Sequence, residues 1–559
     1  MAEPPSLRAL RARPAGAVLP PARTVTLRET NLHKLEEGTF DVLVLGGGIN
    51  GAVSAAALAS GGARTALIDR GDFACATSQE SSNLAWGGIK YLETLEFGLV
   101  RKLCRSRNAL IATHPSTVHE VRFFTLRPRG FRHGLWKLLA GAWLYWLMGS
   151  FFTKRPRMLS ARTIAEEEPI VNPAEFDGGL EYSDAFLHDN DARFVWGFVR
   201  SALDNGCIAT NYVESLGATL GPDGVWTCRA REVLTRREFD IRARVLVNAS
   251  GPFADRHNAL TKVTTQARHV FSKGIHLIVP RLTPSRRVLT FFADDGRMFF
   301  VIPMGPRSVI GTTDTRVEQP ETQVTPEDRR FVLDNINKRL RLPKPLTEAD
   351  VIAERCGVRP LAVTGTGSQA DWLQLSRKHV VEVSPGEAHL TIFGGKLTDC
   401  VNVGDEVASH VERLGVALPF RDRPWHGEPS ADVRDAFLHQ ARLMDLDRMT
   451  QPASAEPLTT RLWRRYGMRA FELLESIRRE PSMAEVLIEG AEYIRAEIEL
   501  TARTEMVTKL DDFLRRRSKI ALVMRRSDLE TAPGLDEACE RFFGEDARAK
   551  FDDYFRKKA

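Results

Sequence analysis

The chain has 559 residues, 43% of them hydrophobic, which is enough apolar material for a large globular fold of two or three domains. Its 78 basic and 72 acidic residues leave a formal net charge of +6, too slight and too dispersed for a nucleic-acid binder, whereas anionic small molecules or an anionic lipid surface fit. Seven cysteines without a CxxC pair argue against a disulfide framework and a zinc site, and favour a reducing compartment.

Residues 1–38 are rich in Arg, Pro and Ala and lack the apolar core of a secretory signal, so they predict a disordered tail. An Arg-rich leader is also typical of organellar transit peptides. Glu3, Glu29, Glu36 and Glu37 dilute that second pattern, which therefore stays the alternative.

Residues 41–70 predict a dinucleotide-binding βαβ unit. The apolar run DVLVL suits a buried parallel strand, and it ends in a glycine turn that opens a helix of small residues. In such a unit Gly46 makes the turn, Gly48 lets the backbone approach a pyrophosphate, and Gly51 lets the helix pack on the strand. Asp69, at the end of the next strand, would bind a ribose hydroxyl. The motif does not distinguish FAD from NAD.

A polar loop, ACATSQESSNLAWGGIKYLE, follows at residues 74–93. Its hydroxyl and amide side chains are hard to justify as core and suit an extended cofactor threaded along the loop, although a solvent-exposed loop has the same composition. The candidate cofactor contacts are Thr77, Ser78, Ser81, Ser82, Asn83, Gly87 and Gly88.

The segment LWKLLAGAWLYWLMGSFF (135–152) is apolar apart from Lys137, and arginines and lysines flank it. Aromatic residues beside basic ones suit the lipid headgroup region, so it predicts an in-plane anchor in one leaflet, with a buried core helix as the open alternative. The chain has no run of about 18 uncharged apolar residues, and a membrane-spanning helix is not expected.

Two later strand-to-glycine junctions extend the predicted cofactor domain. RVLVNASGPFAD (244–255) predicts a strand that ends near Gly251, and residues 389–411 predict another strand, glycine turn and helix. The turn at Gly394 and Gly395 directs a helix N-terminus at an electron-rich group, and a reduced flavin carries such charge near N1 and the C2 carbonyl. The junctions are far apart in sequence and predict a domain built from discontinuous segments.

Together these motifs resemble the FAD-dependent, quinone-linked glycerol-3-phosphate dehydrogenases, within the group of flavoproteins that includes D-amino acid and glycine oxidases. Many flavoproteins have the first motif, whereas the later ones in this order are specific to the family. The matching stretches are GGGINGA (46–52), ACATS with SSNLAWGGIKYLE (74–93), EYSDAF (181–186), VNASGPFAD (247–255), KGIHLIVPR (273–281), FFVIPMG with IGTTDT (299–315), CGVRPL (356–361) and FGGKLTD (393–399).

The resemblance implies an α/β fold with a Rossmann-type FAD-binding domain of the glutathione-reductase and D-amino-acid-oxidase type, an α+β substrate domain and a helical C-terminal cap. The expected FAD-binding segments are 39–125, 195–260 and 350–415. The substrate and membrane-facing domain takes 126–194 and 261–349. Residues 416–559, whose helical periodicity carries charged faces and no catalytic motif, form the cap, with packing or homodimer contact as its role. Further implied cofactor contacts are Asn50, Asp314, Lys396, Leu397 and Thr398.

The implied reaction is oxidation of sn-glycerol 3-phosphate to dihydroxyacetone phosphate by hydride transfer from C2 to FAD N5, with ubiquinone or menaquinone as acceptor. Family members associate with one leaflet, so a peripheral protein on the cytoplasmic face of the inner (plasma) membrane is expected, and a mitochondrial one is less favoured. The alternatives are an oxidase that uses oxygen, an enzyme for another small anionic hydroxy compound, and a non-catalytic flavin-bound protein.

A phosphate dianion needs fixed cations, preferably planar arginine forks. Arg359 precedes Pro360, which favours an extended backbone. His276 suits proton transfer because an ordinary imidazole pKa is near neutrality, with Lys396 or water as alternative acceptors. Without the resemblance these would be surface ion pairs and a satisfied histidine. The implied substrate contacts are Lys90, Tyr91, His276, Arg359, Arg377 and Lys396, and the implied catalytic residues are His276, Arg359 and Lys396.

The sequence departs from the family pattern at three positions. Trp86 replaces a histidine before the double glycine, Lys90 replaces an arginine, and Asp399 replaces a threonine. Lys90 keeps the charge but loses the bidentate fork, so we expect an altered arrangement for the phosphate.

Overall fold

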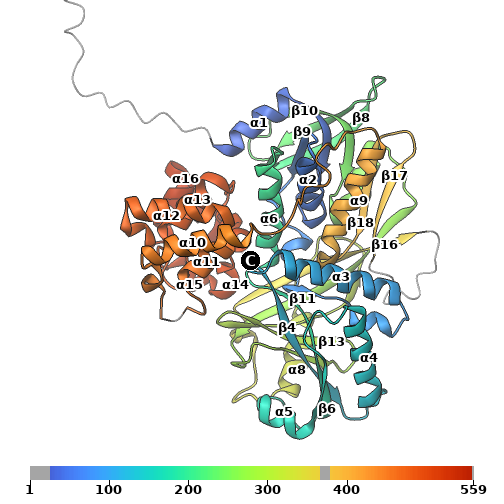
Figure 1. Cartoon of the computed structure of the whole chain (residues 1–559), viewed down its shortest axis with the longest axis vertical. Coiled ribbons are helices and arrows are strands. Elements are labelled where there is room, and N and C mark those ends of the chain that lie inside the picture. Colours follow the sequence, from blue (N-terminus) through green and yellow to red (C-terminus); the bar gives the residue numbers. More distant parts are fainter. Residues whose placement is uncertain (1–25, 365–377, 453, 557–559) are drawn as a thin grey trace, which may run out of the picture.

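In the computed structural model, which describes residues 26–364, 378–452 and 454–556, two β-sheets lie one above the other, with a bundle of helices beside them (Figure 1). The upper sheet in that view contains the predicted strand-to-glycine junctions. The lower sheet contains the strands of the expected substrate domain. The reaction chemistry must therefore be sought where the two sheets meet.

The first sheet has the strand order β17-β18-β10-β1-β2-β7, with β8 and β9 extending it beside β10. Strands β18, β10, β1, β2 and β7 run parallel to one another, which explains the continuous apolar sequence of β1: it is buried from both faces. Helix α2 packs on one face together with α6 and α9. The bounds are β1 Thr39–Leu45, β2 Thr65–Asp69, β7 Ile208–Asn211, β8 Val213–Leu220, β9 Trp226–Glu232, β10 Glu238–Asn248, β17 His379–Ser384, β18 His389–Gly394, α2 Ile49–Gly61, α6 Asp191–Asp204, α7 Ala254–Thr261 and α9 Cys400–Arg413.

The second sheet has the strand order β15-β11-β14-β13-β12-β4-β6-β3, and β16 and β5 pair with β11 and β6. Helices α5 and α8 cover one face, and α3 and α4 pack on the other. The bounds are β3 Leu84–Ala85, β4 Val118–Pro128, β5 Arg157–Ser160, β6 Phe176–Leu187, β11 Ala267–Pro280, β12 Val288–Phe292, β13 Met298–Met304, β14 Arg307–Gly311, β15 Thr315–Val317, β16 Ala353–Thr364, α3 Phe97–Thr113, α4 Leu135–Met148, α5 Ala161–Glu167 and α8 Pro326–Arg339.

The C-terminal helices form a separate bundle, orange to red in Figure 1, that packs beside α6. It has two apolar cores of its own, which confirms the predicted helical domain. The bounds are α10 Ala431–Leu443, α11 Leu458–Tyr466, α12 Ala470–Arg479, α13 Arg495–Thr504, α14 Ile520–Val523, α15 Arg526–Glu530, α16 Leu535–Phe543 and α17 Ala547–Arg556.

The expectation of a disordered tail is wrong for residues 27–37, which form helix α1 (Leu27–Glu37). Thr26 and Glu29 make a reciprocal capping box at its start, and Leu32 and Leu35 are buried against the first sheet. The helix is stable because of this cap and this packing, neither of which appears in composition. Residues 1–25 lie outside the described residues.

The expected domain boundaries also need correction. Strands β3, β4 and β16, assigned by sequence to the FAD-binding domain, pair in the second sheet, and the start of α6, assigned to the substrate domain, packs on α2. A strand joins the sheet that offers it a tertiary partner, and composition does not reveal that partner.

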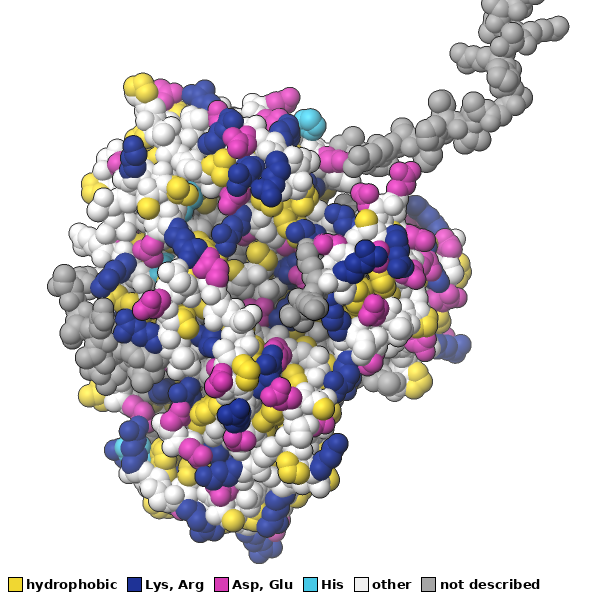
Figure 2. Space-filling view, turned by 180° about the vertical axis from the view of Figure 1, so that it is seen from behind, with side chains coloured by type: hydrophobic (Ala, Val, Ile, Leu, Met, Phe, Trp, Pro, Cys, Tyr) yellow, Lys and Arg dark blue, Asp and Glu magenta, His cyan; other side chains and the backbone are white. Residues whose placement is uncertain are grey.

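Figure 2 shows the face of the molecule opposite to that of Figure 1. Basic and acidic side chains are interspersed over it, with single hydrophobic side chains between them. On this face the small net charge is therefore spread out, not concentrated in one patch.

Candidate active site

The glycine turn between β1 and α2 has the geometry that its sequence predicts. Gly46 has a φ of +101°, and a Cβ there would lie 2.6 Å from the carbonyl oxygen of Ala249. A Cβ on Gly51 would lie 1.8 Å from the carbonyl oxygen of Gly46, so only glycine lets the helix begin this close to the strand. Gly48 is the N-cap of α2 and, as a glycine, has no side chain to cap the helix. A helix N-terminus exposed in this way is suited to a pyrophosphate.

Asp69 lies at the end of β2, beside this turn. Its carboxylate accepts hydrogen bonds from the backbone N–H groups of Gly47, at 2.6 Å, and Gly71, at 2.8 Å. Burial raises the pKa of Asp69, against the opposing effect of those two N–H donors. Asp69 thus fixes the turn, in addition to the predicted ribose contact.

Distant motifs meet at the start of α2. Asn50 donates a hydrogen bond through Nδ2 to the carbonyl of Gly394, at 3.0 Å, and the N–H of Ile49 donates to Ser78 Oγ, at 3.0 Å. Gly394 and Gly395 have φ values of +63° and +99°. The two glycine turns and the polar loop therefore enclose one space.

Two cavities adjoin in that space. One, of about 590 Å³, is lined by the glycine turn, Asp69 and Gly251, and the other, of about 820 Å³, extends to the second sheet. They share seven lining residues, so a single elongated molecule can occupy both. Together with the helix N-terminus and the positive-φ glycines, this shape fits a dinucleotide. The shared residues are Ile49, Thr77, Ser78, Glu80, Gly357, Pro360 and Gly395.

The larger cavity, called the reaction cavity below, brings together side chains from both sheets. His276 comes from β11 and Arg359 from β16, Lys396 follows β18, and Lys90 and Tyr91 belong to the 3₁₀ turn Ile89–Leu92. Ser81, Ser82, Asp314, Leu397 and Thr398 line it as well. The chain order gives no hint of this convergence, since it depends on the packing of one sheet against the other.

His276 is buried and faces the reaction cavity. Among the described residues, neither of its ring nitrogens has a hydrogen-bond partner. Burial, and then the nearby charges of Arg355 and Arg359, lower the pKa of His276 to about 3. The imidazole is therefore neutral at physiological pH and has a lone pair for a proton, but it is a weaker base than the ordinary histidine on which the sequence expectation rested.

Arg359 extends over the backbone of Gly274. A Cβ on Gly274 would lie 2.3 Å from an Arg359 nitrogen, so this glycine leaves room for the guanidinium. The guanidinium donates to Thr312 Oγ1 at 3.1 Å, and it lies 3.5 Å from an Asp314 carboxylate oxygen. Asp314 thus orients Arg359 from the side, and the fork stays at the cavity wall.

Lys396 lies between aromatic rings. Its ammonium is 4.1 Å from the centroid of Tyr91 and 5.2 Å from that of Trp86. Trp86 is itself held by a hydrogen bond from Nε1 to the hydroxyl of Tyr182, at 3.3 Å. These rings hold the cation by its attraction to their π faces, and Trp86, a departure from the family pattern, so acquires a defined contact.

The comparisons with known proteins agree with this geometry. A family model described as FAD dependent oxidoreductase matches residues 41–396, and one described as the C-terminal domain of alpha-glycerophosphate oxidase matches residues 439–550. Glycerol-3-phosphate dehydrogenase 2 of Mycobacterium tuberculosis is 30% identical over 541 residues, which are 95% of this chain and 88% of that protein. Glycerol-3-phosphate dehydrogenase of Pseudomonas aeruginosa is 31% identical over 505 residues, covering 87% of this chain and 93% of that one.

The chain belongs to the FAD-dependent glycerol-3-phosphate dehydrogenase family. Among solved structures, glycerol-3-phosphate dehydrogenase from Bacillus halodurans complexed with FAD matches with a TM-score of 0.68 at 23% identity, covering 95% of this chain and 97% of that one. L-alpha-glycerophosphate oxidase from Mycoplasma pneumoniae with FAD bound matches with a TM-score of 0.52 at 18% identity, covering 70% and 97%. These likenesses confirm the predicted fold class, and the family confirms FAD as the cofactor.

Three of the predicted cofactor contacts have other surroundings in the structure. Asn83, Gly87 and Gly88 do not line the cavities described here. Asn83 donates through Nδ2 to the carbonyls of Leu187 and Asp189, and its Oδ1 accepts a hydrogen bond from Arg355. The Tyr145 hydroxyl fills the space beside Gly87. Asn83 and Gly87 thus support the loop from within the protein. Arg377 lies outside the described residues.

Asp399, the third departure from the family pattern, points away from the reaction cavity. It is buried, and it contacts His379 Nδ1 at 2.7 Å and Asn402 Nδ2 at 2.5 Å. His379 also contacts Glu406, at 2.9 Å. The substitution therefore adds a charged network at the start of α9 without adding a cavity group.

Arg355 is the functional neighbour that sequence reasoning missed. It is fully buried, and its NH1 donates to the Ser81 carbonyl at 2.7 Å and to Asn83 Oδ1 at 2.6 Å. Arg355 on β16 lies opposite His276 on the neighbouring strand β11. Its hydrogen bonds to Ser81 and Asn83 stabilise the polar loop. Its position immediately before CGVRPL (356–361), four residues ahead of Arg359, is the only sequence signal, and it does not distinguish the two arginines.

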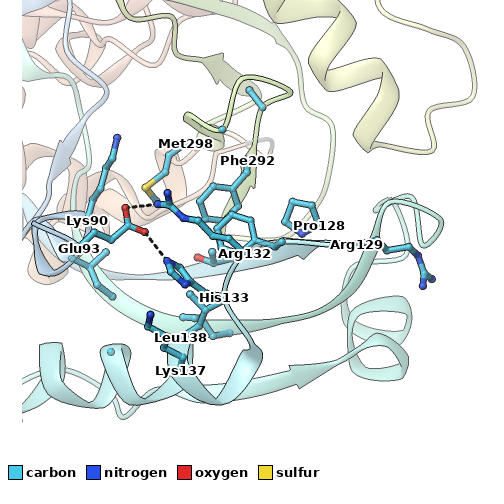
Figure 3. A pocket seen from close by; sticks show the side chains of 18 of the residues that line it. Lys90, Glu93, Pro128, Arg129, Arg132, His133, Lys137, Leu138, Phe292 and Met298 are labelled. Carbon is cyan, nitrogen blue, oxygen red and sulfur yellow. Dashed lines mark hydrogen bonds and ion pairs between the residues drawn. The ribbon is translucent and has the colours of Figure 1, made fainter. Parts of the chain in front are cut away.

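A third cavity, of about 1150 Å³, adjoins the reaction cavity (Figure 3). Lys90, Glu93, Arg132 and Met298 line both. Arg132 and His133 contact Glu93 at 3.0 and 3.9 Å, and Figure 3 shows Lys137 and Leu138 of α4 below His133. The cavity thus connects the reaction cavity to the apolar helix α4.

Helix α4 is half buried. Ala142 and Tyr145 pack inward, whereas Trp136 is 74% exposed and Leu147 is 54% exposed. Trp143, Leu144, Phe151 and Phe152 continue this apolar surface. No helix among the described residues is long and apolar enough to cross a bilayer. The buried-core alternative for this segment is wrong, because only one side of it packs on the protein.

Proposed function

We propose that the protein oxidises sn-glycerol 3-phosphate to dihydroxyacetone phosphate and passes the electrons to ubiquinone or menaquinone. The reaction cavity is the observation that carries the proposal: Lys90, Arg359 and Lys396 line it together with the neutral imidazole of His276. Relatives across most of the chain are named glycerol-3-phosphate dehydrogenases.

The side chains have complementary roles. The cations of Arg359, Lys396 and Lys90 bind the phosphate dianion, and the Arg359 fork does so bidentately. His276 accepts the C2 hydroxyl proton at a ring nitrogen. Bound FAD supplies the hydride acceptor at N5. Arg355 and Arg359 disfavour an imidazolium in the empty cavity, and the incoming dianion offsets their charge just when the proton must be accepted.

An anaerobic titration of the yellow protein with phosphorylated and carboxylated alcohols tests this proposal. Glycerol 3-phosphate should bleach the flavin absorbance at far lower concentration than the others, because only it matches both the cations and the base. Bleaching by a carboxylated alcohol instead would contradict the substrate assignment. Release of hydrogen peroxide in air, at a rate equal to that of dye reduction, would indicate that oxygen and not a quinone is the electron acceptor.

The third cavity supports the assignment of a quinone as acceptor. Its lining combines apolar residues such as Leu138, Phe292 and Met298 with basic ones such as Lys137, and α4 forms one wall. An apolar acceptor that dissolves in the bilayer could thus approach the flavin from the side of α4.

Filling this cavity should block the acceptor step selectively. A Cβ on Gly141 would meet no atom within 4 Å, so Gly141→Leu fits α4 and fills cavity space. We expect several-fold slower reduction of a soluble quinone, with anaerobic flavin reduction by substrate unchanged. Gly98→Leu is the control, since Gly98 is an exposed helical glycine, also without neighbours within 4 Å, outside the cavity. Unaltered quinone kinetics in Gly141→Leu would reject the route.

The exposed face of α4 supports peripheral docking on one leaflet, and we assign it to the cytoplasmic face of the inner membrane. Trp143→Asp with Leu147→Asp should move the protein from the membrane pellet to the supernatant, because charge is disfavoured in the acyl region. Leu443→Asp with Met468→Asp, at residues 75% and 55% exposed in the C-terminal domain, is the matched control. An anchor variant that still pellets like the control would refute this docking face.

A further inference from the structure

The C-terminal domain reaches the FAD site through three consecutive arginines. Arg515, Arg516 and Arg517 lie on the π-helical turn Asp512–Arg517. All three contact the loop at residues 72–80, between β2 and the reaction cavity. Residues 74–80 line the smaller cofactor cavity, so the arginines grip a loop that forms the wall of the cofactor site.

Two of the arginines hold Asp72. Arg517 donates to it bidentately, with both nitrogen–oxygen distances 2.8 Å, and Arg516 Nε donates at 2.6 Å. Asp72 is buried. Burial by itself would raise the pKa of Asp72, but Arg517 and Arg516 hold it below its ordinary value. The carboxylate is thus ionised and fixed at the start of the loop.

A line of ring contacts continues from Arg517 to the glycine turn. The Arg517 guanidinium lies 4.2 Å from the Trp196 ring centroid, and the Trp196 ring lies 5.8 Å from that of Phe73. A Cβ on Gly47 would lie 2.4 Å from Phe73 Cδ1. These contacts therefore connect the C-terminal domain to the glycine turn that is predicted to bind the pyrophosphate.

Arg515 holds Glu80, at the other end of the loop. Its NH2 lies 2.9 Å from each carboxylate oxygen of Glu80, and it also donates to the Glu354 carbonyl at 3.1 Å. Glu80 accepts a further hydrogen bond from the N–H of Cys356, at 3.1 Å. Glu80 lines both the smaller cofactor cavity and the reaction cavity. Arg515 thus compensates the negative charge of a carboxylate that lines the cofactor site.

We infer that the C-terminal domain completes the FAD site, with Arg515, Arg516 and Arg517 as positioning residues and Arg515 compensating the negative charge of Glu80 beside the cofactor. Packing or dimer contact is therefore not the whole role of this domain. This role of the C-terminal domain does not depend on which alcohol the enzyme oxidises.

The pairing of Arg515 with Glu80 determines the direction in which the midpoint potential of the flavin should change when either residue is replaced. Arg515→Met keeps most of the side-chain volume and removes the charge, so Glu80 would face the cofactor uncompensated. A negative charge disfavours the electron-rich reduced flavin. We expect a lower midpoint potential, by a tenfold change in the preference for the reduced form or more, which is about 30 mV for a two-electron couple. FAD affinity should fall as well.

The potential is measured by reductive titration with dithionite and a reference dye, which needs no substrate. Glu80→Gln should shift the potential upwards, because Arg515 is then unpaired, and Glu80→Gln with Arg515→Met should return it towards wild type. Arg525→Met is the control: Arg525 lies in the same domain and donates to the carbonyls of Val351 and Ala349, away from the cavities. Glu80→Gln keeps the test decisive if Arg515→Met fails to fold.

Opposite shifts in the two single variants, cancelled in the double variant and absent from Arg525→Met, support the inference. An unchanged potential overturns it. So do shifts of one sign in both single variants, or a shift in Arg525→Met of equal size, because each of these indicates a general loss of packing.

Discussion

Arg359→Ala should lower kcat/KM for glycerol 3-phosphate by two to three orders of magnitude while the protein keeps its FAD. A hydrogen bond to a charged group contributes about 1.5–3 kcal/mol, and loss of a bidentate pair removes about 3–4 kcal/mol, where about 1.4 kcal/mol is tenfold. Arg359 lines the reaction cavity and donates to Thr312 on the side of the second sheet, so FAD binding should persist. Steady-state kinetics and the flavin content of the purified variant measure both effects.

Two further variants separate geometry from charge. Arg359→Lys should recover only part of the loss, since an ammonium restores the charge without the planar fork. Arg329→Ala is the matched control: its side chain is 27% exposed, against 28% for Arg359, and it pairs with Glu354 outside the cavities. If Arg359→Ala retained the kinetics of Arg329→Ala, the phosphate would have to bind elsewhere.

The cofactor side of this site could be read from sequence because its signals are local. At Gly51 a Cβ would collide with the carbonyl oxygen of Gly46, in the same turn, and each junction combines strand, turn and helix in one short stretch. The parallel pairing of β1 with β2 and β10 follows from the same stretches. Such features depend on steric rules that hold in any chain.

The parts that sequence missed depend on partners far along the chain. Helix α1 needs its contacts with β7 and β10, and β16 joins the second sheet because β11 offers it a long antiparallel partner. Asn83 resembles its polar neighbours in composition, yet its amide is used by Leu187 and Asp189. Whether a polar side chain faces a cavity or supports a loop is decided by such tertiary contacts.

The three arginines 515–517 illustrate the same limit. In sequence they are a basic stretch within an amphipathic region, which usually means a solvated face. In the structure Arg516 and Arg517 are buried, because Asp72 supplies the opposite charge. An unpaired buried guanidinium would be strongly disfavoured, so the two segments fold as one unit.

His276→Gln should slow anaerobic flavin reduction at saturating substrate by about 10²- to 10⁴-fold, the usual contribution of a general base. Gln keeps a polar group of similar length but cannot accept a proton at pH 7. Because burial, and then Arg355 and Arg359, lower the pKa of His276 to about 3, the wild-type imidazole is neutral and supplies this acceptor throughout the pH range 5–8. Stopped-flow absorbance of the flavin measures the rate, and the apparent affinity for substrate should change far less.

His389→Gln is the matched control for this variant. His389 is also buried and, within the described part of the chain, has no hydrogen-bond partner at either ring nitrogen, but it lies on β18 beside Trp226, away from the reaction cavity. Its replacement shows how far the rate of flavin reduction falls when a buried imidazole outside the reaction cavity is removed. A fall of less than about tenfold in His276→Gln would assign proton acceptance to Lys396 or to water, since neither alternative requires the imidazole to change its protonation state.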